Sequence, residues 1–538
     1  MKLRSLKTPA IVLLSGVAVL FAGCSGHDAA GPVVHANGEE LHGAWGGDEG
    51  LIAVFRGVPF AAPPVGSLRW RAPLPNTRRS GPQAATEFAP ACMQGPHITN
   101  WYAAVADDFG HGPDAVGSPN GVSEDCLYLN VWSPRPDSGA RLPVMVWVHG
   151  GSNKGGWSYE PNYIGARLAA KGVVVVSIAY RLGPFGFFSH PVLDNGEGQP
   201  VANFGWLDTN MAFHWVADNI TAFGGDPENI TAIGESSGAG DISDWVAAEM
   251  AEDSLYRRSI AQSPGGSLDT RRTLADEQAT GRRLIDSLDI QGELTAERIR
   301  EIPAKTLLAA AEVELAGHYF DAVIDGLTMT ERPIESLNRA DMAGIDVLIG
   351  TNADEWYMYI DEDATREDLV QWVEDNVPEQ AQALLAEVRD ETDVRRAIDR
   401  LRTARDTLCP SRYFAARVSE LGGRGWVYYF TRQRPGPGGE KLGAYHGTEI
   451  PYVFDMHDDW LPTEPVDRAV TEAVMDYWVQ FARTGNPNLP GRPEWPLHTA
   501  DKPMVMEIGD NISAMEGHDA TLCDLFGPLR REKSEEQP

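Results

Sequence analysis

The chain has 538 residues, 43% hydrophobic and 23% charged, which is the composition of a globular protein rather than a disordered one. It carries 45 lysines and arginines against 77 aspartates and glutamates, so its formal net charge is −32. A polyanion without a basic cluster is not expected to bind nucleic acid or an anionic membrane face by general electrostatics.

The N-terminus has the pattern of an export signal. Three cations precede an apolar stretch from about Ala10 to Ala22, which is too short to span a bilayer comfortably. The sequence LFAGC that follows resembles the lipobox of bacterial lipoproteins, in which cleavage leaves a lipid-modified cysteine, here Cys24, as first residue. We therefore expect a lipoprotein-type signal peptide over 1–23 and a lipid-anchored protein of the bacterial cell envelope, periplasmic or at the cell surface. Phe21 stands where leucine is usual, so a plain signal peptide and a secreted protein remain the alternative.

Residues 24–31 are expected to be a short tether and residues 530–538 a flexible tail. Between them no Ser/Gly/Pro-rich linker divides the chain, so a single domain is predicted over 32–529. An exported protein can form disulfides, and once Cys24 is set aside an even number of cysteines remains, which favours two bridges. These cysteines are Cys92, Cys126, Cys409 and Cys523.

Apolar runs alternate with segments of helical spacing along the rest of the chain. Strands are predicted within 143–151, 172–183, 229–234, 345–350, 425–433 and 503–509, and helices over 204–225, from 237 onward and over 469–484. The helix from 237 would place Ile242, Trp245, Val246 and Met250 on one face. This alternation predicts an α/β fold, with a large, mostly parallel central sheet covered by helices on both faces.

Residues 230–241, ITAIGESSGAGD, place Ser236 between two glycines where a predicted strand ends and a helix begins. G-x-S-x-G alone is a weak signal, but this position is that of a nucleophile elbow. The strained turn leaves no room for side chains on its flanks and exposes the hydroxyl above a helix N-terminus, which favours developing negative charge. A plain strand–helix turn is the alternative interpretation.

A serine hydroxyl needs a base and a group that orients the base, and acyl transfer also needs donors for the oxyanion. The sequence VHGGSNKGG at 148–156 supplies such donors, because a predicted strand ends in glycines as in the loops of lipases and esterases. His149 is interpreted as a loop-shaping residue, since this loop acts through its backbone amides. The residues alone do not identify the acid, and Asp354 is as plausible as its neighbour Glu355.

With these segments the chain resembles the type-B carboxylesterases, the cholinesterase-like branch of the α/β-hydrolases. The resemblance runs over nearly the whole mature chain and implies the α/β-hydrolase fold and hydrolysis of small carboxylic esters through an acyl-enzyme. It rests on FRGVPFAAPPVGSLRW, SEDCLYLNVW, VWVHGG, YRLGPFGFF, NITAFGGDPENITAIGESSG, IGTNADE, YHGTEIPYVF and FARTGNPN, in the family's order. No H-E-x-x-H, C-x-x-C, P-loop or G-x-G-x-x-G sequence is present, so no metal or nucleotide cofactor is expected.

The resemblance also assigns roles to single residues. It puts the nucleophile at Ser236, the orienting acid at Glu355 and the general base at His446, in the chain order of the hydrolases. It implies oxyanion donors in the glycine loop and after the nucleophile, and two acidic positions that tune the site from behind the reacting groups. These are Gly150, Gly151, Ser152 and Ser237 for the oxyanion hole, and Glu235 and Glu449 for the acidic positions.

The chain departs from the family's pattern at several of these positions. Ser152 replaces a third glycine and Ser237 replaces an alanine, which adds two hydroxyls. Asp241 and Asp244 lie early in the helix after the elbow, where favourable charge at a helix N-terminus is the simplest explanation. Trp101 does not match the spacing of the tryptophan that holds a quaternary ammonium in cholinesterases, so a choline-ester specialist is not expected.

The resemblance implies the bridges Cys92–Cys126 and Cys409–Cys523. Two other functions remain open on the sequence: a binding or adhesion module of the same fold, and an amidase or peptidase that uses the same triad. The intact set Ser236, Glu355 and His446 favours an enzyme over a binding module. The natural substrate and the oligomeric state cannot be read from the motifs.

Overall fold

The apolar runs of the sequence form the strands of a large sheet in the computed structural model, which describes residues 31–527 except 77–80, 138, 195, 197, 250–254, 266–271 and 339–340. The predicted signal peptide, Cys24, nearly the whole predicted tether, Met250 and the predicted tail lie outside the described residues. Within the described ranges, no helix has the length and apolar character to cross a membrane.

The strands are β1 (Val33–Ala36), β2 (Glu39–His42), β3 (Ala44–Gly46), β4 (Ile52–Pro59), β5 (Gln83–Ala84), β6 (Ala91–Cys92), β7 (Val122–Ser123), β8 (Tyr128–Ser133), β9 (Leu142–Val148), β10 (Val174–Ile178), β11 (Gly225–Glu235), β12 (Arg258–Gln262), β13 (Asp346–Asn352), β14 (Arg424–Phe430), β15 (Met504–Ile508) and β16 (Ile512–Glu516).

The helices are α1 (His97–Asp108), α2 (Ala166–Ala169), α3 (Gly183–Gly186), α4 (Phe204–Asn219), α5 (Ser237–Glu249), α6 (Leu274–Asp286), α7 (Ala296–Arg300), α8 (Ala304–Glu314), α9 (Pro333–Leu337), α10 (Arg366–Asn376), α11 (Ala381–Glu387), α12 (Val394–Thr403), α13 (Cys409–Glu420), α14 (Pro437–Leu442), α15 (Ile450–Phe454), α16 (Pro465–Thr484) and α17 (Ala520–Phe526).

The central sheet has eleven strands in the order β16-β15-β14-β13-β12-β11-β9-β10-β8-β4-β3. Strands β15 to β10 in this order pair in parallel, and the strands at both edges pair antiparallel. The predicted mostly parallel sheet is therefore confirmed. The carboxyl ends of β9, β11, β12 and β13 lie at one edge, and the site is built there.

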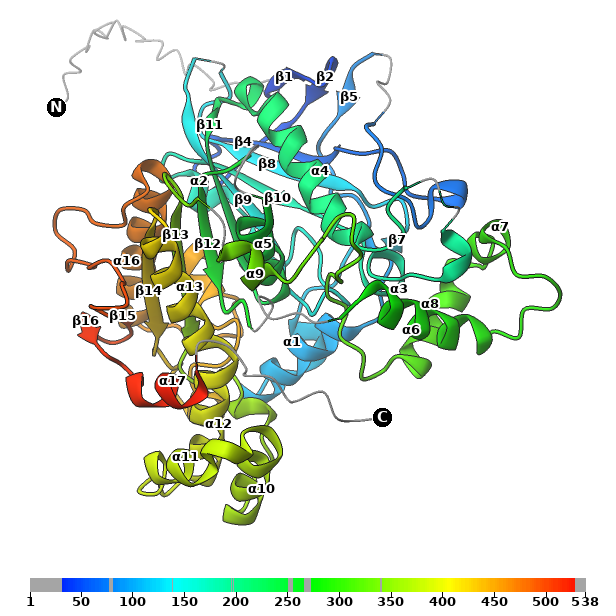
Figure 1. The fold of residues 1–538 in the computed structure, drawn as a ribbon. Coiled ribbons are helices and arrows are strands. Elements are labelled where there is room, and N and C mark those ends of the chain that lie inside the picture. The colour runs from blue at the N-terminus through cyan, green and yellow to red at the C-terminus, as the bar shows by residue number, and fades with distance from the viewer. Residues whose placement is uncertain are drawn as a thin grey trace, which may run out of the picture.

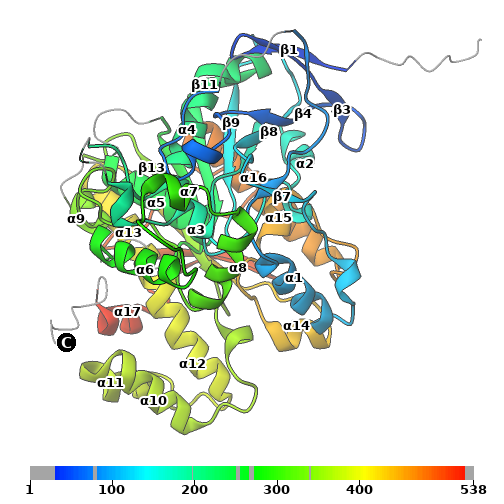
Figure 2. The same ribbon diagram turned by 90° about the vertical axis from the view of Figure 1, so that its right-hand side faces the viewer.

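Helices cover both faces of this sheet (Figure 1 and Figure 2). Side chains alternate along each strand, so Val146 faces the core that contains α4, α5 and α13, and Trp147 faces the core that contains α16. Both residues are fully buried. The three long helices predicted from spacing are α4, α5 and α16, whereas β12, a run of only five residues with arginine and glutamine at its ends, was not predicted.

A small lobe of α10, α11 and α12 projects from the body at the bottom of Figure 1 and has its own apolar core. Helix α12 continues through a π-helical turn, Ala404–Leu408, into α13, where Pro410 lacks the amide that a regular α-helical hydrogen bond would need. The disulfide Cys409–Cys523 joins α13 to α17 beside this lobe. It is one of the two bridges that the resemblance implied.

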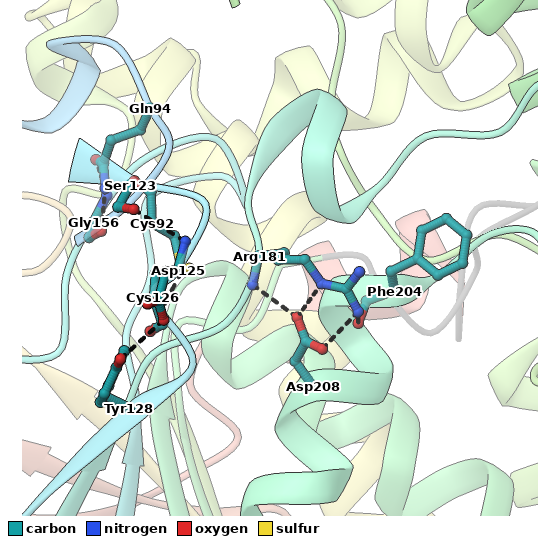
Figure 3. The surroundings of a disulfide bond; sticks show 10 residues. All are labelled: Cys92, Gln94, Ser123, Asp125, Cys126, Tyr128, Gly156, Arg181, Phe204 and Asp208. Atoms are coloured by element: carbon teal, nitrogen blue, oxygen red, sulfur yellow. Dashed lines mark hydrogen bonds and ion pairs between the residues drawn. A yellow bond between two sulfur atoms is a disulfide. The ribbon is translucent and has the colours of Figure 1, made fainter. Parts of the chain in front are cut away.

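The second implied bridge, Cys92–Cys126, closes the segment that contains α1. Figure 3 shows its surroundings, where Arg181 donates to both carboxylate oxygens of Asp208 at 2.7 Å. This ion pair is buried and ties the chain after β10 to α4. The disulfide prediction is therefore confirmed for both pairs.

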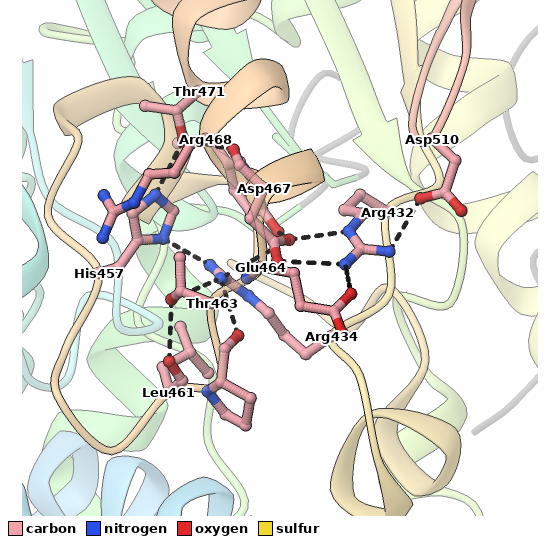
Figure 4. A network of polar contacts seen from close by, with 12 residues as sticks. Arg432, Arg434, His457, Leu461, Thr463, Glu464, Asp467, Arg468, Thr471 and Asp510 are labelled. Atoms are coloured by element: carbon pink, nitrogen blue, oxygen red, sulfur yellow. Dashed lines mark hydrogen bonds and ion pairs between the residues drawn. The ribbon is translucent and has the colours of Figure 1, made fainter.

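A second buried ionic cluster holds the start of α16, and Figure 4 shows it. Asp467 accepts hydrogen bonds from Arg432 at 2.8 Å and from the hydroxyl of Tyr452 at 2.6 Å, and the guanidinium of Arg434 lies 3.8 Å away. Arg432 also pairs with the exposed Asp510 at 2.8 Å. The buried carboxylate and both guanidinium groups each lie beside opposite charge, and the cluster fixes the chain after β14 to the helix.

Candidate active site

Ser236 lies between the end of β11 and the start of α5, in a left-handed backbone conformation with φ of 54°. Its amide donates to the carbonyl oxygen of Gln262 at 2.8 Å, which anchors the turn to β12. A Cβ atom at Gly238 would come within 2.3 Å of the Val148 oxygen, so only glycine allows the helix to approach β9 this closely. The sequence thus builds the sharp turn that its glycines predicted.

The glycine loop after β9 runs directly against this turn. A Cβ atom at Gly150 would lie 2.8 Å from the Cβ atom of Ser236. The loop then turns through Gly151 and Ser152, with φ of 108° and 58°. The amides of Gly151, Ser152 and Ser237 make no hydrogen bond to another described backbone group. The structure therefore brings all the predicted oxyanion-hole residues to the nucleophile's turn and leaves these amides available.

His446 and Glu355 are in direct contact, with 2.5 Å between Nδ1 and Oε2. Glu355 is buried, and its other oxygen accepts hydrogen bonds from the Asn352 amide at 2.7 Å and from the hydroxyls of Thr351 and Ser263 at 2.7 Å and 2.5 Å. Burial alone would raise the pKa of Glu355, but His446 and these donors hold it below its usual value. Glu355 is thus held as a carboxylate on one side of the imidazole.

Asp354, the neighbouring acid, makes no contact with His446 among the described interactions. It accepts hydrogen bonds from Arg396 at 2.8 Å and from the Ala444 amide at 2.7 Å. Its own amide donates to the Ala444 oxygen, and Asp354 forms a β-bridge with Tyr445. Asp354 therefore joins the two loops that carry Glu355 and His446, and of the two acids it is Glu355 that contacts the imidazole.

Nε2 of His446 lies 3.2 Å from Oε1 of Glu235, the residue before Ser236. Among the described contacts, Ser236 Oγ makes no hydrogen bond to the imidazole. Catalytic hydrogen bonds are often long and tighten only when substrate binds, so the absence of this hydrogen bond is compatible with His446 as the general base. Nε2 therefore lies beside the residue that precedes the nucleophile.

Buried carboxylates surround this histidine. Burial raises the pKa of Glu235 to about 8. Burial also raises the pKa of Glu449, although hydrogen bonds from Asn352 at 2.6 Å and Gln262 at 2.8 Å oppose this. Burial would lower the pKa of His446, but the charges of Glu235 and Glu355 outweigh it and raise that pKa. Shifted pKa values of this kind gather at catalytic sites.

His149 lies under the glycine loop rather than at the reacting groups. Its Nδ1 is 2.8 Å from the Gly150 oxygen, and its ring stacks on Tyr180 with centroids 4.6 Å apart. Burial lowers the pKa of His149 to about 4, so the ring is neutral at physiological pH. This geometry is that of a residue that shapes the loop.

Two aromatic residues beside the site were not identified from the sequence. A Cβ atom at Gly447, next to His446, would lie 3.9 Å from the ring of Trp101 and 3.5 Å from Glu235 Oε1. Trp101 Nε1 donates to the Tyr359 hydroxyl at 2.7 Å. In the sequence, the position of Trp101 does not match that of the tryptophan of cholinesterases. In the structure, α1 brings the ring of Trp101 to the site, so only the fold identifies Trp101 as a residue of the site.

Asp241 and Asp244 do not lie where a helix N-terminus stabilises charge. Helix α5 has no acid in its first turn, and both aspartates are buried further along it. The helix-terminus explanation is therefore corrected, because that effect falls off within the first turn. Asp241 lies instead 3.4 Å from the side-chain amide of Asn153 in the glycine loop.

No group of three or more histidine, cysteine, aspartate or glutamate side chains in the described part of the chain has an arrangement that could hold a metal ion. The chemistry that the residues themselves can supply is acyl transfer. A serine in a strained elbow, free backbone amides beside it and a histidine on a buried carboxylate are the groups that this reaction needs.

Comparison with known proteins agrees with this chemistry. The model of the Carboxylesterase family matches residues 31–526. A fumonisin B1 esterase of Sphingopyxis macrogoltabida is 31% identical over 498 residues, which cover 88% of this chain and 86% of that protein. A phenmedipham hydrolase of Pseudarthrobacter oxydans is 33% identical over 503 residues, which cover 89% and 95%.

Solved structures show the same likeness. A carboxylesterase of Geobacillus stearothermophilus is 29% identical with a TM-score of 0.78, covering 92% of this chain and 100% of that one. A PNB esterase is 27% identical with a TM-score of 0.78, covering 92% and 99%. The chain therefore has the α/β-hydrolase fold, belongs to the type-B carboxylesterase family and is a carboxylic ester hydrolase.

Proposed function

We propose that the protein hydrolyses small carboxylic esters through an acyl-enzyme on Ser236, with His446 as general base and acid and Glu355 as the group that orients it. The observation that carries this proposal is the 2.5 Å contact between His446 Nδ1 and Glu355 Oε2, with Nε2 turned to the elbow. The contact fixes the tautomer that leaves Nε2 free to accept a proton.

In the first half-reaction, Ser236 Oγ attacks the ester carbonyl carbon while its proton passes to His446 Nε2. The carbonyl oxygen becomes an oxyanion, which the amides of Gly151, Ser152 and Ser237 stabilise. The bond between the carbonyl carbon and the alkoxy oxygen then breaks. His446 returns the proton to that oxygen, and the alcohol leaves.

In the second half-reaction, His446 takes a proton from water, and the hydroxide attacks the acyl carbon. The bond to Ser236 Oγ breaks, the proton returns from His446 to the serine, and the carboxylic acid leaves. Glu355 keeps its charge throughout and stabilises the imidazolium that forms in each half.

The test is turnover of a p-nitrophenyl ester by wild type and by Ser236→Ala. The variant is expected to stay folded and to lose turnover by roughly 10⁶-fold, because the covalent step disappears. Turnover at the wild-type rate would reject the nucleophile. A matched p-nitroanilide measures amide cleavage in the same assay and distinguishes an esterase from an amidase that uses the same triad.

We also propose that Cys24 carries lipid and anchors the enzyme in the bacterial cell envelope, since two or more acyl chains hold a protein stably at a membrane. The support is the sequence pattern before Cys24. Cys24→Ser should move the enzyme from the membrane fraction to the soluble fraction. Identical fractionation of variant and wild type would leave a plain signal peptide and a secreted enzyme.

A further inference from the structure

The glycine loop has a left-handed backbone conformation at three consecutive residues, two of which are not glycine. Gly151, Ser152 and Asn153 have consecutive φ values of 108°, 58° and 51°. Glycine adopts this region freely and asparagine tolerates it, but serine does so only at a cost in free energy. Within the loop, the Lys154 and Gly155 amides donate to the Gly151 oxygen at 3.0 Å and 3.1 Å, and further contacts come from outside it.

Those contacts converge on Asn153, which is 1% exposed. Its amide donates to Ser237 Oγ at 3.0 Å, and its carbonyl oxygen accepts from the Gly183 amide at 2.7 Å. Its side-chain oxygen accepts from the Tyr180 hydroxyl at 3.1 Å, and its side-chain nitrogen lies 3.4 Å from Asp241. All four polar groups of one loop residue are thus engaged.

Two of these partners belong to α5, the helix that directly follows the nucleophile. Ser237 is the first residue of α5 and directly follows Ser236, and Asp241 lies four residues further along the same face. The hydroxyl of Ser237 is therefore a direct link between the backbone of the glycine loop and the residue beside the nucleophile. An alanine at this position could not make that link.

We propose that Ser237 is a positioning residue: its hydroxyl, through Asn153, fixes the loop so that the amides of Gly151 and Ser152 face the oxyanion, and it offsets the strain that Ser152 introduces. The proposal rests on the proposed acyl-enzyme mechanism. It makes the two departures from the family's pattern, serine for glycine at 152 and serine for alanine at 237, a coupled pair. The hydroxyl at 237 is needed because the residue at 152 is not glycine.

A double-mutant cycle tests the coupling. The variants are Ser237→Ala, Ser152→Gly and the double variant, with Ser243→Ala as matched control. Ser243 is buried in the same helix, but its hydroxyl donates to the Ala239 oxygen at 2.8 Å and does not touch the loop. Each variant is measured for kcat and KM with p-nitrophenyl butyrate and for Ki with a trifluoromethyl ketone. Ser236 Oγ adds to the ketone carbonyl carbon, and the carbonyl oxygen becomes an oxyanion in the hole.

Ser237→Ala is expected to lower kcat about tenfold and to raise Ki by a similar factor, with KM within about twofold, because the loss falls on the oxyanion. In the Ser152→Gly background the same substitution should cost about threefold or less, because glycine holds the loop conformation without the tie. Ser243→Ala should change kcat and Ki less than about twofold.

An equal loss from Ser237→Ala in both backgrounds would overturn the coupling, and unchanged kcat and Ki would overturn the positioning role. A similar loss in Ser243→Ala would assign the effect to the helix as a whole and would also reject it. Titration of each variant with a p-nitrophenyl phosphonate counts reactive Ser236. Failure of wild type to release stoichiometric p-nitrophenol would reject the acyl-enzyme mechanism itself, which separates the two conclusions.

Discussion

The buried ionic clusters around Asp467 and around His446 differ in their balance of charge. Around Asp467, two arginines face one buried carboxylate, and further acids lie at the rim of the cluster. Hydrogen bonds to Asp467 and the charges of the arginines lower the pKa of Asp467 to about 2 in spite of its burial. Around His446, three buried glutamates face a single imidazole. There the pKa values of Glu235, Glu449 and His446 are all raised.

This difference in charge distinguishes a buried cluster that stabilises the fold from one that serves catalysis. A balanced cluster keeps its groups ionised and joins elements of the fold, and removing one partner leaves an uncompensated charge. An unbalanced cluster holds groups whose protonation changes easily, which a proton-transfer site needs. The two clusters should therefore respond in opposite ways to the same kind of substitution.

The largest expected effect is the loss of the charge behind His446. Glu355→Gln should lower kcat/KM about 10⁴-fold, because the imidazole loses its orienting carboxylate and the stabilisation of its charged form. Asp354→Asn, the matched substitution of the adjacent residue, should lower it less than about tenfold. Steady-state kinetics with one p-nitrophenyl ester measures both. The reverse ranking would transfer the orienting role to Asp354.

The balanced cluster should instead respond in stability. Asp467→Ala should lower the free energy of unfolding by about 3–5 kcal/mol, because Arg432 and Arg434 lose their buried partner. Urea unfolding measures this, and kcat per folded molecule should stay at the wild-type value. Asp510→Ala removes the exposed carboxylate from the same Arg432 and should cost less than about 1 kcal/mol. Equal costs for the two variants would contradict the distinction between the buried and exposed pairs.

A smaller effect is expected on the pH dependence of catalysis. His446 acts as a base only when unprotonated, so kcat/KM rises with pH as its proton leaves, and its raised pKa places this rise above the ordinary histidine value. Glu235→Gln removes the carboxyl group 3.2 Å from Nε2, whose ionised form raises the pKa of His446, so proton loss from the imidazole becomes easier. The acid limb should therefore move to lower pH by about one unit.

Glu449→Gln provides the graded control for this shift. Glu449 also raises the pKa of His446, but less than Glu235 does, so the same limb should move in the same direction by less. A shift to higher pH in either variant would contradict the electrostatic account of the site.

The smallest effect concerns the charge of the substrate. The acids beside the site and the net charge of −32 should repel carboxylate-bearing esters relative to neutral ones, mainly through the association rate. The ratio of kcat/KM for matched neutral and anionic esters should favour the neutral ester several-fold at low salt and approach unity at high salt. A preference for the anionic ester that weakens with salt would reveal a cationic pocket.

Local patterns in the sequence predicted a large part of this structure. The continuous apolar runs at β9 and β10 indicated a buried parallel sheet, and the glycines around Ser236 indicated the elbow, because both signals lie within about ten residues. The antiparallel edge strands and β12 carry no comparably strong local pattern. They depend on pairing with distant strands.

The parts of the site that local sequence patterns alone did not identify depend on contacts between distant segments. Glu355 and Asp354 are adjacent in sequence, and only the bridge to Tyr445 decides which of them meets His446. Trp101 reaches the site because α1 brings it there. Glu355 accepts hydrogen bonds from Ser263, which directly follows β12, and from Thr351, which lies in β13. No sequence motif marks either hydroxyl.

The central claim is that Ser236 forms the covalent intermediate. Peptide mass spectrometry after inactivation with a p-nitrophenyl phosphonate tests this most directly. The account predicts one equivalent of p-nitrophenol released, one phosphonyl adduct on Ser236, and neither release nor adduct in Ser236→Ala. An adduct on another residue, or full inactivation with Ser236 unmodified, would contradict it.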